Sequence, residues 1–347
     1  MARGKSAHRV LAVSMGDPAG IGPEIILKAA AAMARRPGAP PMVVVGDLEA
    51  MRAAARGLGS VPAPEEWRPN GVPAPAAGLL PVATIGRLSA RARQPGHPSV
   101  EGGDAAYRYV VAAARMALEG RAAAMVTAPI SKEWFQRAGH NFPGHSELLA
   151  KLARARLWRM MFVGEQLRLV LVTVHIALAS VPKALTRAGV YRTIVLLAEH
   201  LHRSGGVVRP RLGVLGLNPH AGEAGLFGDE EIRVIAPAIR QAQRDGIDAF
   251  GPLAPDTAFV RTKGHFAFDA AVAMYHDQGL IALKSLEFDR AVNVTLGLPF
   301  VRTSPDHGTA FDIAGSGRAR PDSMIAALDY AGKTLAKGAG ARRALAA

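Results

Sequence analysis

The chain contains no cysteine among its 347 residues. Disulfide bonds, thiolate metal ligands and a cysteine nucleophile are therefore excluded. Long apolar segments are missing too: no run approaches the roughly 20 residues of a membrane-spanning helix. The apolar stretch Val10–Met15, which follows a basic start, is too short for the core of a secretory signal. We therefore expect a cytoplasmic protein that does not associate with membranes.

Aromatic residues are scarce, at 5%, and acidic residues are outnumbered by basic ones, 28 against 42, which gives a formal net charge of +14. Such a charge fits nucleic acid, an anionic membrane surface or an acidic small molecule as partner. Nucleic-acid-binding proteins usually concentrate basic residues on one stripe and combine them with aromatics or a known reading motif. The arginines here are scattered along the chain. This pattern favours a small anionic substrate and no nucleic-acid partner.

The hydrophobic content of 49% is enough for a folded core. Short runs rich in Val, Leu and Ile alternate with helical stretches rich in Ala and Leu, which is typical of an α/β fold with a mostly parallel sheet covered by helices. The segment Ser60–Pro81 is dense in Pro, Ala and Gly and predicts an irregular surface loop. The predicted strands are Val10–Met15, Met42–Gly46, Ala123–Thr127, Leu167–Val174, Leu212–Leu217 and Ala271–Met274, and the predicted helices are Pro23–Arg35, Gly103–Glu119, Leu185–Arg203, Glu230–Asp245 and Asp322–Lys337.

A glycine-rich motif, MGDPAGIGPE at residues 15–24, joins the first predicted strand to the first predicted helix. A turn of this kind can present backbone N–H groups and a positive helix end to an anion or a nucleotide. Its glycines do not have the G-x-G-x-x-G spacing, so an ordinary Rossmann dinucleotide site is only weakly indicated. The alternative is a tight strand-to-helix turn without a ligand.

Three histidines, His175, His220 and His276, each follow a predicted strand. In open α/β sheets, ligands gather beyond the carboxyl ends of the strands. Three imidazoles at that edge could bind one divalent metal ion and leave positions open for substrate. Their separations in the sequence are too long to form a local motif, and each could equally be a hydrogen-bonded structural residue.

Two acidic and three further polar residues complete the candidates in this part of the chain. Asp277 follows one of these histidines and could orient a metal ligand or transfer protons; Asp256 is a second candidate, and either could instead cap a helix or turn. Lys284, Asn293 and Arg302 lie among apolar neighbours, which suggests recognition of phosphate or carboxylate. Surface solvation or a salt bridge is the alternative for these three.

The glycine-punctuated segment Asp306–Gly317 precedes the last predicted helix. Such a loop could wrap an adenosine, with His307 against the base and Asp312 accepting hydrogen bonds from the ribose hydroxyls. An acidic group at that position would repel a ribose phosphate, so Asp312 favours NAD over NADP. A plain connecting loop is the alternative.

Eight ordered segments together resemble the 4-hydroxythreonine-4-phosphate dehydrogenase family of pyridoxal phosphate synthesis. The resemblance implies the two-domain isocitrate/isopropylmalate dehydrogenase-like fold, with mostly parallel sheets covered by helices and the active site in the interdomain cleft. It also implies two domains. The first consists of residues 1–135 and 300–347 and carries the cofactor loop, and the second consists of residues 136–299 and contributes metal, substrate and dimer contacts. The segments are MGDPAGIGPE (15–24), VTAPISK (126–132), FPGHSELLA (142–150), VTVHIAL (172–178), LNPHAGE (217–223), GPLAPDTAF (251–259), AMYHDQGL (273–280) and VNVTLGLPFVRTSPDHGTAFDIAG (292–315).

The resemblance also implies site residues and a homodimer in which one subunit lends a metal ligand to the other. Ser146 stands where the family usually has Thr, and the serine retains the hydroxyl group. Pro305 stands where the family usually has Val. The implied metal ligands are His175, His220 and His276; the substrate residues are His145, Ser146, Lys284, Asn293 and Arg302; the cofactor residues are His307, Gly308, Thr309 and Asp312; and Asp256 and Asp277 are the candidates for proton transfer.

The activity that the resemblance implies is oxidation of 4-phosphohydroxy-L-threonine with NAD and a divalent metal, zinc, magnesium or cobalt. The 3-oxo acid would decarboxylate to 3-amino-2-oxopropyl phosphate. Paralogous activities toward D-threonate or D-erythronate 4-phosphate, or toward the cis-dihydrodiol of terephthalate, remain open because they need the same metal and cofactor residues. A noncatalytic anion- or nucleic-acid-binding protein is the alternative of another class; it would show no NAD turnover and salt-dependent polynucleotide binding.

Overall fold

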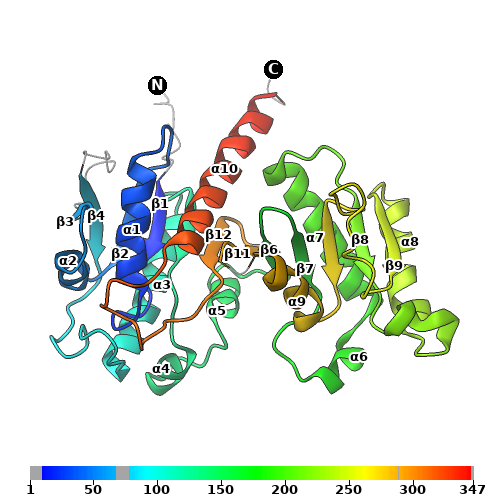
Figure 1. Cartoon of the computed structure of the whole chain (residues 1–347), viewed down its shortest axis with the longest axis horizontal. Helices are drawn as coiled ribbons and strands as arrows, with labels where there is room; N and C mark the ends of the chain where they lie inside the picture. Colours follow the sequence, from blue (N-terminus) through cyan, green and yellow to red (C-terminus); the bar gives the residue numbers. More distant parts are fainter. Residues whose placement is uncertain (1–9, 68–77, 288, 345–347) are drawn as a thin grey trace. The chain divides into compact units, whose positions relative to one another are not determined.

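The computed structural model describes residues 10–67, 78–287 and 289–344. These residues form two compact units, one containing 10–67, 78–158 and 298–336 and the other containing 159–287, 289–297 and 337–344 (Figure 1). Each unit is a mostly parallel β-sheet flanked by helices, which confirms the predicted α/β class. The division between the units follows Trp158, whereas the predicted division follows residue 135. Residues 136–158 therefore lie in the first unit.

The sheet of the first unit is parallel throughout. Its order is β3-β4-β2-β1-β5-β12, and each neighbouring pair runs in the same direction. Every residue of β1, β2 and β5 is buried, as expected for central strands covered on both faces. The bounds are β1 Leu11–Ser14, β2 Met42–Gly46, β3 Ala63–Glu66, β4 Leu79–Thr84, β5 Ala124–Thr127 and β12 Val301–Pro305.

Local capping signals start several helices of this unit. The side chains of Asp47, Ser99 and Ser131 each accept a hydrogen bond from a backbone N–H of the helix that follows. The long helix α3 buries an alanine-rich face against the sheet, and that face forms much of the core. The bounds are α1 Gly22–Ala34, α2 Leu48–Arg56, α3 Val100–Leu118, α4 Lys132–Arg137, α5 His145–Leu152 and α10 Asp322–Ala344.

The sheet of the second unit is mixed, in the order β11-β6-β7-β10-β8-β9. Strand β6 (Arg159–Val163) runs antiparallel to both β11 (Val292–Leu296) and β7 (Arg168–Leu171). The remaining pairs, among β7, β10 (Ala270–Ala273), β8 (Leu212–Leu215) and β9 (Ala249–Leu253), are parallel. The helical segments are η1 Leu178–Ser180, α6 Val181–Ala184, α7 Arg187–His200, η2 Leu201–Gly205, η3 Pro219–Gly225, η4 Glu231–Ile235, α8 Ala236–Arg244 and α9 His276–Glu287.

All six predicted strands and all five predicted helical regions are present, with ends shifted by up to seven residues; the largest shift is at the end of α10. The predicted helix Leu185–Arg203 corresponds to α7 and part of η2, and Glu230–Asp245 to η4 and α8. The interpretation of Ser60–Pro81 as an irregular loop was wrong at both ends, which form β3 and the start of β4; residues 68–77 lie outside the described residues. Proline is tolerated in β3 because this strand is at the edge of its sheet. Across the described ranges, no helix has both the length and the apolarity needed to cross a membrane.

Candidate functional site

Three neighbouring parallel strands of the second unit carry the predicted metal ligands. Strands β7, β10 and β8 lie side by side, and His175, His276 and His220 follow them in that order. The ring centroids of His175 and His276 are 5.7 Å apart, with the ring planes at 45°. The topology thus brings two of the three imidazoles together, as the positions after the strands predicted.

His276 is the first residue of α9, and its ring is oriented by the next residue. Its Nδ1 atom lies 2.6 Å from Oδ1 of Asp277, so Nε2 is the nitrogen left for another partner. A carboxylate on the second ring nitrogen is the usual way in which a metal-binding histidine is held in one tautomer and orientation. Asp277 itself is largely exposed, at 72% of its side chain.

His220 lies in η3 and is exposed. The backbone from His220 to Ala224 has positive φ angles, an unusual run for residues other than glycine. The buried Glu231 supports the preceding turn, because its Oε1 accepts hydrogen bonds from Leu217 N at 2.7 Å and Asn218 N at 2.8 Å.

The donor set of these histidines suits a divalent ion only in part. Imidazole nitrogen is a preferred ligand of zinc and related metals. Two rings are close together, but no three His, Asp or Glu side chains in the part of the chain that the structure describes are grouped closely enough to hold one ion. His175 and His276 therefore form the core of the candidate metal site.

A second cluster lies in the first unit at the start of α5. The first two residues of α5 are His145 and Ser146, and Ser146 is buried. The Nε2 atom of His145 is also buried and has no hydrogen-bond partner among the described residues. Burial lowers the pKa of His145 well below its usual value, and the positive charges of Arg302 and Lys132 lower it further. The imidazole is therefore neutral at pH 7 and available as a hydrogen-bonding group.

Arg302 lies on β12 and is 2% exposed. Its Nη2 donates a hydrogen bond of 2.7 Å to Oγ1 of Thr127, which ends the adjacent strand β5. Burial lowers the pKa of Arg302 to about 9, an effect that the Glu147 carboxylate opposes. The guanidinium therefore remains charged at neutral pH. A buried cation is stabilised by an anion, so this cluster is chemically suited to bind a phosphate or a carboxylate.

Two residues of this cluster were missed by reasoning from the sequence. Thr127 holds Arg302, and Lys132 is close enough to influence the pKa of His145. Both belong to the segment VTAPISK at 126–132, which carries part of the family resemblance. That segment was the available signal, but it gave no role to either side chain.

The other predicted site residues of the second unit lie on different elements. Lys284 is half-buried on α9, and Asn293 is half-buried on β11 with its Oδ1 buried and without a partner among the described residues. Asp256 is exposed in the turn after β9. The predicted residues are thus distributed over both units, with His145, Ser146 and Arg302 in the first.

The predicted cofactor loop connects β12 to α10 within the first unit. His307, Gly308 and Asp312 are exposed, and a Cβ atom added at Gly308 would meet nothing within 4 Å. Thr309 is half-buried, and its carbonyl accepts a hydrogen bond from Ile21 N at 2.9 Å. The loop therefore offers an open surface around Gly308 and Asp312.

The glycine-rich motif is a tight turn whose N–H groups are mostly bonded within the protein. Asp17 N donates to Pro129 O, and Gly20 N donates to Asp17 O. Ala19 N donates to Oδ1 of Asp17 at 3.0 Å, and Ile21 N is bonded to the cofactor loop. Of the two interpretations of this motif, the tight turn is the one that the geometry supports, because these groups are not available to an anion.

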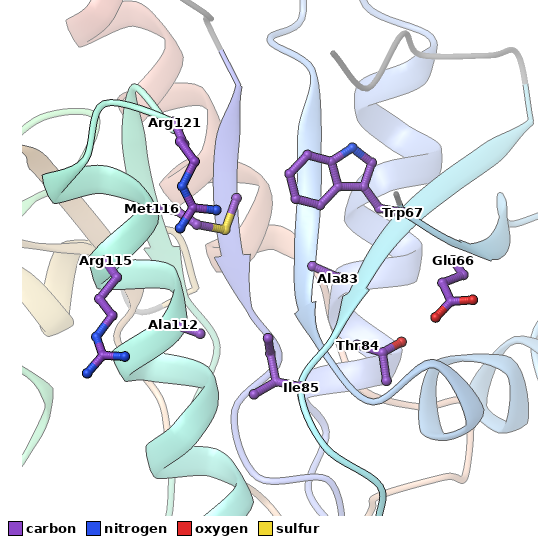
Figure 2. Close-up of a pocket in the computed structure, with 9 residues that line it drawn as sticks. All are labelled: Glu66, Trp67, Ala83, Thr84, Ile85, Ala112, Arg115, Met116 and Arg121. Carbon is purple, nitrogen blue, oxygen red and sulfur yellow. The ribbon is translucent and has the colours of Figure 1, made fainter. Parts of the chain in front are cut away.

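A cavity of about 390 Å³ lies elsewhere in the first unit, between α3 and the strands β3 and β4 (Figure 2). Arg115, Met116 and Arg121 line it on one side, and Trp67 and Ile85 on the other. None of the predicted site residues lines this cavity. The candidate site is thus defined by the two side-chain clusters and the loop, and not by this cavity.

Comparison with known proteins connects these features to one family. The family model described as Pyridoxal phosphate biosynthetic protein PdxA matches residues 39–331. A 4-hydroxythreonine-4-phosphate dehydrogenase of Geobacter metallireducens is 50% identical over 322 residues, which are 92% of this chain and 93% of that protein. A D-threonate 4-phosphate dehydrogenase of Pectobacterium atrosepticum is 43% identical over 328 residues, 93% of this chain and 98% of that protein. The crystal structure of a 4-hydroxythreonine-4-phosphate dehydrogenase from Klebsiella pneumoniae superimposes with a TM-score of 0.81 at 41% identity, covering 94% of this chain and 99% of that one.

Proposed function

Because the chain belongs to the Pyridoxal phosphate biosynthetic protein PdxA family, we propose that it is a dehydrogenase that oxidises 4-phosphohydroxy-L-threonine with NAD and a divalent metal ion. The product would be a 3-oxo acid that loses carbon dioxide to give 3-amino-2-oxopropyl phosphate. The observation that carries the proposal is the buried, charged Arg302 beside the neutral His145, because this pair is suited to an anionic substrate.

In this proposal the first unit binds the anionic end of the substrate. Arg302, oriented by Thr127, supplies the charge, and His145 and Ser146 supply hydrogen bonds at the start of α5. Lys284 and Asn293 of the second unit are assigned to the remaining polar groups of the substrate. The positive net charge of +14 supports an anionic substrate without identifying it.

The residues that would hold the metal are His175, His276 and His220. A divalent ion there would supply Lewis acidity toward the substrate hydroxyl and toward the oxygen of the keto acid. Asp277 keeps the His276 ring in one orientation through the contact with Nδ1. Asp256 and Asp277 are the groups proposed to transfer protons. Of the proposed metals, zinc and cobalt suit imidazole ligands better than magnesium, which prefers oxygen ligands.

The loop that follows β12 is the proposed binding segment for NAD, which would accept the hydride. His307, Gly308 and Thr309 would contact the adenosine, and the exposed Asp312 would accept hydrogen bonds from the ribose hydroxyls. The negative charge of Asp312 would disfavour the ribose phosphate of NADP.

We propose a homodimer in which the metal site is shared between subunits, because the described residues of one chain contain no group of three His, Asp or Glu side chains that could hold the ion alone. Apolar side chains close to His220 in the sequence are exposed, with Leu226 at 73% and Ile232 at 54%. Large exposed apolar side chains are typical of protein–protein contact surfaces. We place this dimer in the cytoplasm, a reducing compartment whose proteins rarely contain disulfide bonds, which fits a chain without cysteine.

A second substrate deserves a direct comparison, because one relative is named a D-threonate 4-phosphate dehydrogenase. Purified protein would be supplied with NAD, metal and either 4-phosphohydroxy-L-threonine, D-threonate 4-phosphate or D-erythronate 4-phosphate, and NADH would be followed by absorbance. We expect the highest kcat/KM with 4-phosphohydroxy-L-threonine. A higher value with either sugar-acid phosphate would assign the chain to that activity instead.

A further inference from the structure

The segment that joins β12 to α10 passes beside α1 in the first unit (Figure 1). Two residues of the first turns of α1, Glu24 and Lys28, form an ion pair with Nζ and Oε1 2.7 Å apart. The side chain of Glu24 is 4% exposed and that of Lys28 is 22% exposed. This is therefore a mostly buried pair, and it differs from the many exposed ion pairs on the surface of the protein.

The same pair binds the distal end of the loop. Nζ of Lys28 donates to the carbonyl oxygens of Gly317 and Ala319, both at 2.7 Å. Oε1 of Glu24 accepts a hydrogen bond from Ala319 N at 2.9 Å. An ammonium group has three N–H donors, and all three have partners here. The pair thus closes a ring of hydrogen bonds that fixes the chain at Gly317–Ala319.

The proximal end of the loop is bound by the glycine-rich motif that precedes α1. Ile21 N donates to Thr309 O at 2.9 Å. A Cβ atom at Gly20 would lie 3.0 Å from that same carbonyl oxygen and 3.1 Å from Cβ of Thr309, so a larger residue would push the two segments apart. The motif and the ion pair therefore hold the loop at two points, and the exposed Asp312 lies between them.

We infer that Glu24 and Lys28 are positioning residues for the nucleotide: they fix the far end of the loop so that Asp312 is presented to the ribose. This inference rests on the proposed role of the loop in binding NAD. It also gives a function to the glycine-rich motif, which then acts as the second support of the cofactor loop rather than as an anion site itself.

The test uses Lys28→Met, which removes both hydrogen bonds to the loop carbonyls, with Lys28→Arg as the conservative variant. Because Lys28→Met leaves the Glu24 carboxylate without its cation, the double variant Glu24→Gln/Lys28→Met is included to remove the buried charge as well. The matched control is Arg52→Met on α2. Arg52 also pairs with a glutamate one turn away, Glu49 at 2.9 Å, and approaches a carbonyl distant in sequence, Pro64 O at 3.5 Å.

Two properties are measured on the full-length protein: amide hydrogen exchange of peptides that span 306–319, and the Kd of NAD together with kcat and both KM values. We expect Lys28→Met and the double variant to exchange faster in this loop and to bind NAD about tenfold more weakly, with kcat at saturating NAD and the KM of the hydroxy acid nearly unchanged. Lys28→Arg should restore most of the affinity, and Arg52→Met should change neither property.

Unchanged exchange in the loop would overturn the inference at its first step, because the ion pair would then not hold the loop. Faster exchange with an unchanged Kd would show that the support has no bearing on the nucleotide and would overturn the positioning role. If the unaltered protein bound no NAD at all, the proposed function of the loop would fall, while the exchange data would still decide whether Glu24 and Lys28 anchor it.

Discussion

Arg302 on β12 donates a hydrogen bond from Nη2 to Oγ1 of Thr127, the last residue of the adjacent parallel strand β5, over a distance of 2.7 Å. The arginine is buried, so its orientation is set by such contacts and not by solvent. A guanidinium held in this way recognises planar anionic groups with a fixed geometry. Under the proposed substrate-binding role of Arg302, we expect Thr127, which touches it, to affect substrate affinity.

Replacing Thr127 by Val should therefore weaken binding of the phosphorylated substrate. The change keeps the shape of the side chain and removes one hydrogen bond to a charged partner, which contributes about 1.5 kcal/mol, or about tenfold in the KM of the substrate. The KM of NAD should stay close to its original value. Thr127→Ser retains the hydroxyl and serves as the control; equal KM values for Thr127→Val and the unaltered protein would show that Thr127 does not orient Arg302 for substrate.

The histidines after β7 and β10 should determine the metal content. We expect His175→Ala and His276→Ala each to lose metal, measured by elemental analysis after dialysis, and to lose metal-dependent turnover with it, because each removes one imidazole ligand. His265→Ala is a suitable control, since His265 is an exposed residue of the same unit in the turn that bridges back to Thr262. Full metal content in His175→Ala would refute the ligand assignment, and His220→Ala tests the third ligand in the same way.

The preference for NAD should depend on Asp312. This residue is exposed and has neither a hydrogen bond nor an ion pair with any described residue, so its carboxylate is available to a ligand. Asp312→Ser removes the negative charge that would repel the ribose phosphate, so kcat/KM with NADP should rise by about tenfold. The value with NAD should fall, because the ribose hydroxyls lose a carboxylate acceptor. The kinetic constants with both nucleotides provide the measurement. An unaltered protein that prefers NADP would contradict this assignment directly.

The buried Asp17 of the glycine-rich motif should make stability depend on pH. Burial raises its pKa from 3.8 to about 6, although the hydrogen bond from Ala19 N opposes the shift. The folded protein therefore binds the carboxyl proton of Asp17 more tightly than the unfolded chain does. At about 1.4 kcal/mol per pKa unit, this shift corresponds to ~3 kcal/mol of stabilisation. The stabilisation is present at low pH and is lost as the pH rises through about 6.

Asp17→Asn cannot ionise, so it isolates this contribution. Urea unfolding of both proteins at several pH values should show the unaltered protein losing free energy of unfolding relative to Asp17→Asn as the pH rises from 3.8 through about 6. If the difference between the two proteins were the same at every pH, the carboxyl of Asp17 would have an ordinary pKa in the folded state.

The central strands were predictable because each is buried along its whole length and therefore appears in the sequence as a continuous apolar run. Strand β3, with the sequence APEE, has no such run and contains a proline. Its strand conformation depends on pairing with β4 at the edge of the sheet, which local sequence does not encode. For the same reason, the pairing partners of the short strand β6 could not be read from its five residues.

The two clusters of the candidate site differ in the same respect. His175, His220 and His276 were predicted to meet because each follows a strand of a parallel sheet, whose carboxyl ends lie at one edge. The structure brings the rings of His175 and His276 together. The contact between Arg302 and Thr127 joins residues 175 positions apart, and no pattern in the sequence relates them. The glycine-rich motif was recognisable as a turn, but its partners, Thr309 and the loop after it, became evident only from the fold.

The most direct test of the proposed function is the metal dependence of NADH formation from 4-phosphohydroxy-L-threonine. Protein freed of metal by a chelator would be assayed with NAD and this substrate before and after addition of zinc, magnesium or cobalt, with NADH followed by absorbance and carbon dioxide measured in parallel. We predict no NADH without metal, and NADH and carbon dioxide in equal amounts once metal is restored. Absence of NADH with every metal, or equal rates with and without metal, would contradict the account.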